Sequence, residues 1–188
     1  MQNREATIIT AAFRLILRYG VARTTMHDIA KEAGTSRQTL YATFPNKEEL
    51  LRATIRYLAD ETVREITAGC AAAETLADQL DVVFNCIAVK HFDLLHASPD
   101  ADDIISGFDA ACKDELAEAA TRYRELIERI LDSHRVTITA AGLTVAQLAD
   151  LIQRSTITLK HEATSRAHLL RLIEALKVLV LNLLKQAA

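Results

Sequence analysis

The chain has 188 residues, half of them hydrophobic, and a mean hydropathy of +0.09, so it is able to bury a real core as one or two domains. Its net charge of −3 argues, taken alone, against a nucleic-acid partner. Charged residues near the N-terminus exclude a signal peptide, and the longest uncharged run, residues 136–149, is too short to span a bilayer; we therefore expect a cytoplasmic protein with no membrane partner.

Apolar residues recur with the helical period along almost the whole chain, whereas strand signals are scarce, so the sequence predicts an all-α fold. The first helix is expected near residues 4–19. One face of it carries Ile8, Ala12, Leu15, Ile16 and Tyr19, and Gly20 ends it. This helix would support the pair of short helices that follows.

Residues 24–51 contain two short helices around a Gly-Thr-Ser turn, an arrangement typical of a helix-turn-helix DNA-binding unit. Thr25 is placed to cap the first helix with Asp28 three residues on, Gly34 to end it, and Ser36 to cap the second helix. The small and apolar residues that let the two helices cross closely are Ile29, Ala30, Ala33, Leu40 and Phe44.

The exposed face of the second helix would then carry Arg37, Gln38, Thr39, Tyr41 and Thr43. Arginine forms a hydrogen-bonded fork with guanine and glutamine does the same with adenine, while threonine contacts thymine methyls or phosphates. The first three of these residues lie in the first helical turn, where a recognition helix meets base edges. The residue types therefore favour DNA reading over a plain three-helix packing unit.

The same stretch strongly resembles the N-terminal domain of the tetracycline-repressor (TetR) family of bacterial regulators. The resemblance covers about a quarter of the chain and rests on Thr24-Thr25, Ile29-Ala30, Ala33 to Ser36, Thr39 to Tyr41, Phe44, Lys47 and Leu50-Leu51. It implies that Thr25 and Lys47 contact phosphates, that Tyr41 and Thr43 contact backbone or a base, and that Arg37 and Gln38 read sequence. Gln38 departs from the glycine common in the family and adds a side chain.

The charge distribution supports a DNA-binding N-terminal domain. Residues 1–47 hold seven basic and three acidic groups, a net charge of +4, which leaves −7 for the remainder. The basic N-terminal segment attracts the phosphate backbone of DNA, and the acidic remainder of the chain limits unspecific binding. We expect domains of residues 1–46, which bind DNA, and 47–188, a helical domain for effector binding and dimerisation.

Five further helices are expected in the second domain. The first is a long helix of residues 47–68 that ends at Gly69, and the next runs from Leu76 to Leu94. The segment 100–109 reads as acidic, with a brief helix and turns. A helix follows over residues 116–131. The last two helices include one capped by Thr144.

The last helix is more apolar than one core face requires, because Leu170, Val178 and Leu181 lie outside its main stripe. Together with Val145 and Ile152 of the preceding helix, these residues are expected to form a homodimer interface. The resemblance implies the same, since the last two helices of the family form a four-helix bundle. A fully buried helix in a monomer is the alternative.

The middle helices are expected to enclose a small, mostly hydrophobic effector. His91 projects beside Phe84 and Ile87, and Tyr123 beside Ile127, so both polar tips point toward apolar surroundings. A histidine or tyrosine satisfied within the core is the alternative for each.

Enzyme and metal chemistry find no support in the sequence. No glycine-rich phosphate loop, nucleophile elbow or zinc-binding helix motif occurs, and no cofactor is expected. Cys70, Cys86 and Cys112 lack metal-ligand spacing, which leaves packing or redox sensing.

The sequence therefore predicts a homodimeric regulator of a palindromic double-stranded DNA operator. By resemblance it would act as a repressor that a small molecule releases. A family member that answers to a protein or activates transcription is the alternative, and a helical interaction module that binds no DNA is a further one.

Overall fold

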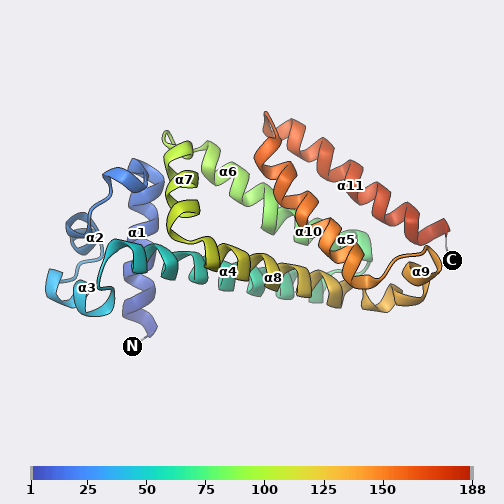
Figure 1. The fold of residues 1–188 in the computed structure, drawn as a ribbon, viewed down its shortest axis with the longest axis horizontal. Helices are drawn as coiled ribbons and strands as arrows, with labels where there is room; N and C mark the ends of the chain where they lie inside the picture. Colours follow the sequence, from blue (N-terminus) through green and yellow to red (C-terminus); the bar gives the residue numbers. More distant parts are fainter. Residues whose placement is uncertain (1, 187–188) are drawn as a thin grey trace. The chain divides into compact units, whose positions relative to one another are not determined.

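The computed structural model describes residues 2–186, and within this range the chain is all helical, with no strand (Figure 1). The predicted all-α class is confirmed. The helices are α1 (Gln2–Arg23), α2 (Met26–Glu32), α3 (Arg37–Thr43), α4 (Lys47–Ala72), α5 (Leu76–Phe84), the π-helical turn η1 (Asn85–Val89), α6 (Lys90–His96), α7 (Ala101–Ala111), α8 (Lys113–Leu131), the short 3-10 turn η2 (Asp132–His134), α9 (Arg135–Ala140), α10 (Val145–Glu162) and α11 (Arg166–Gln186).

The chain forms two compact units. Unit 1 consists of the residues up to 61 together with 94–119, and unit 2 of residues 62–93 together with those from 120 onward. This division does not follow the boundary at residue 46, because α7 packs against α1 and so joins the N-terminal helices (Figure 1). The functional division into residues 1–46 and 47–188 remains a prediction.

Two hydrophobic clusters are formed by the described residues of unit 1. The first joins α1, α2, α3 and the start of α4, with Ile8, Ile29, Leu40, Phe44 and Leu50 nearly or fully buried. The second lies where α1 meets α7, and its buried members are Ile16, Val21, Leu51, Ile104, Phe108 and Cys112. Burial on this scale stabilises by about 1.5–3 kcal/mol for each large side chain, so the short helices α2 and α3 are held by tertiary packing.

In unit 2, α5 and α6 are joined by η1, whose residues 86–89 are all buried. The turn packs against α10 and α11, and α11 also packs against α5. Ion pairs connect the same elements: Lys177 Nζ lies 2.8 Å from the Asp81 carboxylate, and Arg166 Nε lies 2.9 Å from that of Asp93.

The helices differ from the sequence expectation in several places, and the single helix expected from Leu76 to Leu94 is divided into α5, η1 and α6. The acidic segment of residues 100–109 is not a brief helix with turns but most of α7, because its apolar side packs on α1. α4 runs through Gly69 to Ala72; there the glycine admits Val82, whose side chain would lie 2.7 Å from a Cβ at that position. α9 has no counterpart in the prediction.

Candidate nucleic-acid interface

The start of α2 is fixed by the predicted cap. The Asp28 backbone N–H donates to Thr25 Oγ1 at 3.2 Å, and the Thr25 backbone N–H donates to the Asp28 carboxylate at 3.3 Å, a reciprocal capping box. The hydrogen bond from the Thr25 side chain holds the pKa of the Asp28 carboxyl below its usual value. Thr25 therefore orders the helix start, and a phosphate contact by its hydroxyl remains a prediction.

The turn between α2 and α3 is set by Gly34, which has a φ of 63°. Its N–H donates to the Lys31 carbonyl oxygen at 3.2 Å, and the Thr35 N–H donates to that of Ala30 at 3.0 Å. Ser36 then caps α3 by accepting the Thr39 N–H at 3.0 Å. Both predicted helix ends are confirmed.

α3 buries Leu40 and presents Arg37, Gln38 and Tyr41 to solvent. Leu40 is fully buried, whereas Arg37 and Gln38 are exposed and the Tyr41 side chain is half exposed, at 50%. This exposure excludes Tyr41 from the core. The polar face needed for base contact is thus available on a helix that the core holds in place.

Thr39 and Thr43 are less accessible than the sequence suggests, because both are half-buried. The Thr43 hydroxyl donates to the Thr39 carbonyl oxygen at 3.0 Å, and the Thr39 hydroxyl lies 2.9 Å from that of Ser36. These hydroxyls keep acceptor capacity but are tied to the helix.

Arg37 has a neighbour that the sequence analysis missed. Its Nε donates to Nδ1 of His27, on α2, at 2.9 Å. Because this bond uses Nε, the two terminal nitrogens keep the parallel N–H groups that a guanine fork requires. No motif signals the pair, since it depends on how α2 and α3 cross.

Lys47 lies differently from the expected phosphate ligand. Its ammonium group, half-buried at the start of α4, donates to the Val21 carbonyl oxygen near the end of α1. Burial lowers the pKa of Lys47, and the nearby Asp103 carboxylate counteracts this. The Lys47 charge is thus used in a contact within unit 1, although the sequence analysis assigned it to a DNA phosphate.

The five predicted effector residues all lie in unit 2, and four of them are buried: Phe84, Ile87, Tyr123 and Ile127. His91 Nδ1 lies 3.1 Å from the Ile87 carbonyl oxygen. Burial lowers the pKa of His91 to about 4, helped by the Lys160 ammonium, so the ring is neutral at pH 7. These side chains share an apolar interior, and their role toward an effector remains a prediction.

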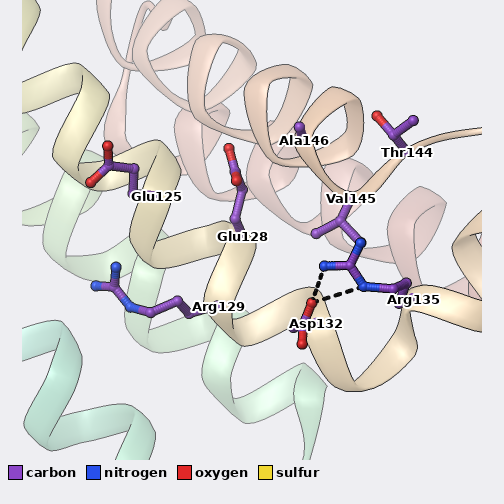
Figure 2. Close-up of a pocket in the computed structure, with 8 residues that line it drawn as sticks. All are labelled: Glu125, Glu128, Arg129, Asp132, Arg135, Thr144, Val145 and Ala146. Atoms are coloured by element: carbon purple, nitrogen blue, oxygen red, sulfur yellow. Dashed lines mark hydrogen bonds and ion pairs between the residues drawn. The ribbon is translucent and has the colours of Figure 1, made fainter.

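A separate hollow of about 560 Å³ lies in unit 2, between the end of α8 and the start of α10 (Figure 2). Its lining is mostly charged, and Arg135 is paired with Asp132 within it. None of the five predicted effector residues lines it; the lining residues are Glu125, Glu128, Arg129, Asp132, Arg135, Thr144, Val145 and Ala146. Its polarity does not suit a mostly hydrophobic molecule.

The predicted dimer residues fall into two groups. Leu170 and Val178 are 40% and 43% exposed, and Leu181 is half-buried, as an unpartnered outer side requires. Val145 and Ile152 are instead buried in the core of unit 2, which corrects their assignment to a surface. In unit 2, the exposed large apolar residues that the sequence analysis missed are Leu151 on α10, Leu179 on α11 and Val136 on α9; in unit 1, Tyr19 is 42% exposed although it was expected on the inner face of the first helix.

The cysteines behave as packing residues. Cys86 and Cys112 are buried and Cys70 is half-buried, and all three are free thiols. Burial raises the pKa of Cys112 to about 11 and raises the pKa of the other two, which disfavours the reactive thiolate. Among residues 2–186, no cluster of three or more His, Cys, Asp or Glu is placed to hold a metal ion.

No single helix of the described chain is long and apolar enough to cross a membrane. Only the pair of residues 113–140 and Val145–Glu162, bent by 114°, meets the length and composition required, and it meets them jointly.

Residues 8–54 match the family described as bacterial regulatory proteins, tetR family. The probable transcriptional regulator ArpR of Pseudomonas putida is 40% identical over 80 residues, which are 43% of this chain and 36% of ArpR. The nicotine-responsive repressor HdnoR of Paenarthrobacter nicotinovorans is 30% identical over 102 residues, 54% of this chain and 48% of HdnoR. The chain spans little more than a third of the length of the first curated relatives it matches.

Solved structures resemble the fold over nearly the whole chain. FadR of Bacillus subtilis, determined in complex with stearoyl-CoA, has a TM-score of 0.66 and 21% identity, and the match covers 91% of this chain and 96% of FadR. The TetR-family repressor AlkX of a Dietzia strain has a TM-score of 0.65 and 21% identity, with 98% and 97% covered. At this identity the likeness establishes the fold.

Proposed function

Because residues 8–54 belong to the tetR family of bacterial regulatory proteins, we propose that the protein is a DNA-binding transcriptional regulator and not an enzyme. It binds a palindromic double-stranded operator as a homodimer in the cytoplasm. Each protomer places α3 in a major groove, and the two-fold symmetry of the dimer matches that of the operator.

The observation that carries this proposal is the arrangement of α3. Arg37 and Gln38 lie exposed in its first turn, while Ser36 caps that turn and Leu40 anchors it from below. A helix that reads bases needs exposed side chains with paired hydrogen-bonding groups on a fixed backbone. Each good bidentate contact discriminates between bases by about 1–3 kcal/mol only if the side chain is preorganised.

We propose further that the regulator is a repressor that a small, mostly hydrophobic effector releases. HdnoR is a nicotine-responsive repressor, and FadR was determined with stearoyl-CoA, whose long acyl chain is apolar; both support an effector with a large hydrophobic part. In this chain the buried residues around the neutral His91 offer an apolar environment with one polar ring. An effector that prefers the form unable to bind DNA weakens operator binding by the factor by which operator weakens effector binding.

The experiment that tests DNA binding is selection of duplexes from a random library by the purified protein, followed by affinity measurements at several salt concentrations. We expect an enriched palindrome, and a specific affinity at least a thousandfold above that for unrelated duplexes, in the range typical of specific binding. Equal affinity for all duplexes would contradict operator recognition, and no binding to any duplex would leave a helical interaction module.

The dimer proposal makes a separate prediction. Val178→Glu places a charge on the outer side of α11, where the valine is 43% exposed, so we expect a folded protein whose dimer dissociates at micromolar concentration. Sedimentation velocity measures the state and circular dichroism the fold. Val136→Glu is the matched control, because that valine is 84% exposed on α9 and should leave the dimer intact. A folded, dimeric Val178→Glu protein would reject this interface.

A further inference from the structure

Residues 20–24 connect the long part of α1 to α2 in a defined turn, here called the α1–α2 connector. Gly20 breaks α1 with φ 80° and ψ 169°, a conformation that essentially only glycine adopts. Thr24 is 2% exposed, and its hydroxyl donates to the Gly20 carbonyl oxygen at 2.7 Å. The connector leads directly into the Thr25 cap, so its position determines where α2 begins.

α7 and its N-cap residue, Asp100, hold this connector through two acidic side chains. The Ala22 backbone N–H donates to Asp103 Oδ2 at 3.0 Å, and the Arg23 guanidinium is paired with the Asp100 carboxylate. The first contact matters most for the backbone, because it satisfies an amide that the break in α1 leaves outside the helical ladder. Charge-assisted bonds of this kind are stronger than neutral ones.

Two glycines make the approach of α7 possible. A Cβ on Gly20 would lie 2.3 Å from Asp103 Oδ2, and a Cβ on Gly107 would lie 2.7 Å from the Val21 side chain. Neither distance is compatible with a larger residue unless the neighbour moves. The carboxylate of Asp103 is therefore packed against the connector as well as bonded to it.

α4 contributes the third anchor. The Lys47 ammonium donates to the Val21 carbonyl oxygen, one residue before the amide that Asp103 accepts. Lys47 and Asp103 thus hold the two polar ends of one peptide unit of the connector, Val21–Ala22, from two helices, and their opposite charges lie close enough to interact.

We infer that Asp103 and Lys47 are positioning residues for DNA binding, which hold the connector so that α2 and α3 meet the operator in the right orientation. The inference rests on the proposed function. In this role Lys47 keeps its bond to Val21 in the complex and contributes no phosphate contact. α2 packs on α1 and carries α3, so a loosened connector displaces the reading face as a whole.

The sign of the effect of an Asp103 substitution separates this role from simple electrostatics. Removing a negative charge from a protein that binds DNA ordinarily strengthens binding, because phosphates repel acidic side chains. The positioning role predicts weaker binding instead. Asp102 supplies the matched control, since it is the next residue on α7 and its side chain is exposed.

We expect Asp103→Ala to weaken operator binding at least about tenfold relative to Asp102→Ala, as loss of a hydrogen bond to a charged group implies. Asp103→Asn, whose amide oxygen still accepts the Ala22 N–H, should fall between them and guards against a folding defect in the alanine variant. Operator affinity is measured on folded protein, as judged by circular dichroism. Asp103→Ala binding as tightly as Asp102→Ala would overturn the role of Asp103.

Hydrogen exchange at the Ala22 amide tests the same contact without DNA. We expect exchange at least about tenfold faster in Asp103→Ala than in the unchanged protein, and no change in Asp102→Ala. Unchanged exchange in Asp103→Ala would contradict the contact. If the unchanged protein bound no DNA, the proposed function would fail while this measurement still decided whether the connector is held.

The role of Lys47 is tested by the salt dependence of operator binding. Removing a lysine that contacts phosphate makes the slope of log K against log [salt] less steep by about 0.9. We expect Lys47→Gln to lose affinity with the slope unchanged, and its effect to be less than additive with that of Asp103→Ala. A flatter slope, or full additivity of the two substitutions, would mean that Lys47 contacts the phosphate backbone and does not act through the connector.

Discussion

Arg37→Ala is expected to remove the preference for one base in each half of the operator. An arginine fork on guanine discriminates by about 1–3 kcal/mol, and a palindromic site is read twice, so the loss for the dimer is about 2–6 kcal/mol. The structure supports this size of effect, because the His27 bond to Nε orients the guanidinium before DNA arrives. Affinities for the selected operator and for variants substituted at each position measure the change.

The control for this prediction is Arg18→Ala. Arg18 is an exposed arginine of α1 that lies over the Tyr19 ring, so its removal takes the same charge from the same unit without touching α3. It should shift all duplexes alike. Gln38→Ala should relax preference at an adenine in the same way as Arg37→Ala does at guanine. Equal losses of specific and unspecific binding in Arg37→Ala would exclude base reading by this residue.

A drop in the stability of the folded protein between pH 6.5 and 4 is expected from His91. Burial lowers the pKa of its imidazole from 6.5 to about 4, so in this range the unfolded chain takes up a proton that the folded chain does not. The neutral His91 therefore makes its whole contribution to the free energy of unfolding above pH 6.5. This contribution is lost as the pH falls toward 4, and the free energy of unfolding decreases by about 3 kcal/mol in total. The Lys160 ammonium adds to the effect, and the Glu65 carboxylate and the Ile87 carbonyl oxygen oppose it.

Denaturant unfolding across this pH range, in the unchanged protein and in His91→Gln, isolates the contribution. Glutamine does not titrate and still offers an N–H to the Ile87 carbonyl oxygen, while the other five histidines are common to both proteins. The difference between the two curves should shrink as the pH falls from 6.5 to 4. Parallel curves would mean that His91 is accessible to solvent and protonates with the fold intact.

The helix ends of the DNA-binding region follow from local chemistry, and for that reason the sequence predicts them. Thr25 with Asp28, Gly34 and Ser36 satisfy or end the backbone within three or four residues of their own positions, whatever lies elsewhere in the chain. The buried Leu40 and the exposed Arg37 and Gln38 follow from helical periodicity in the same way. The resemblance of these residues to the TetR family rests on the same short spacings.

Tertiary structure alone decided which partner each of these groups meets. Periodicity shows that a helix has an inner face but not what packs there, so Val145 and Ile152 looked like interface residues although unit 2 buries them. The partners of charged groups lie even farther away in the sequence. Lys47 donates to a carbonyl oxygen 26 residues away, and Asp103 accepts a hydrogen bond from an amide 81 residues away. A sequence fixes charge and helical phase over a few residues, whereas such pairings depend on how distant helices cross, and only the folded chain determines that.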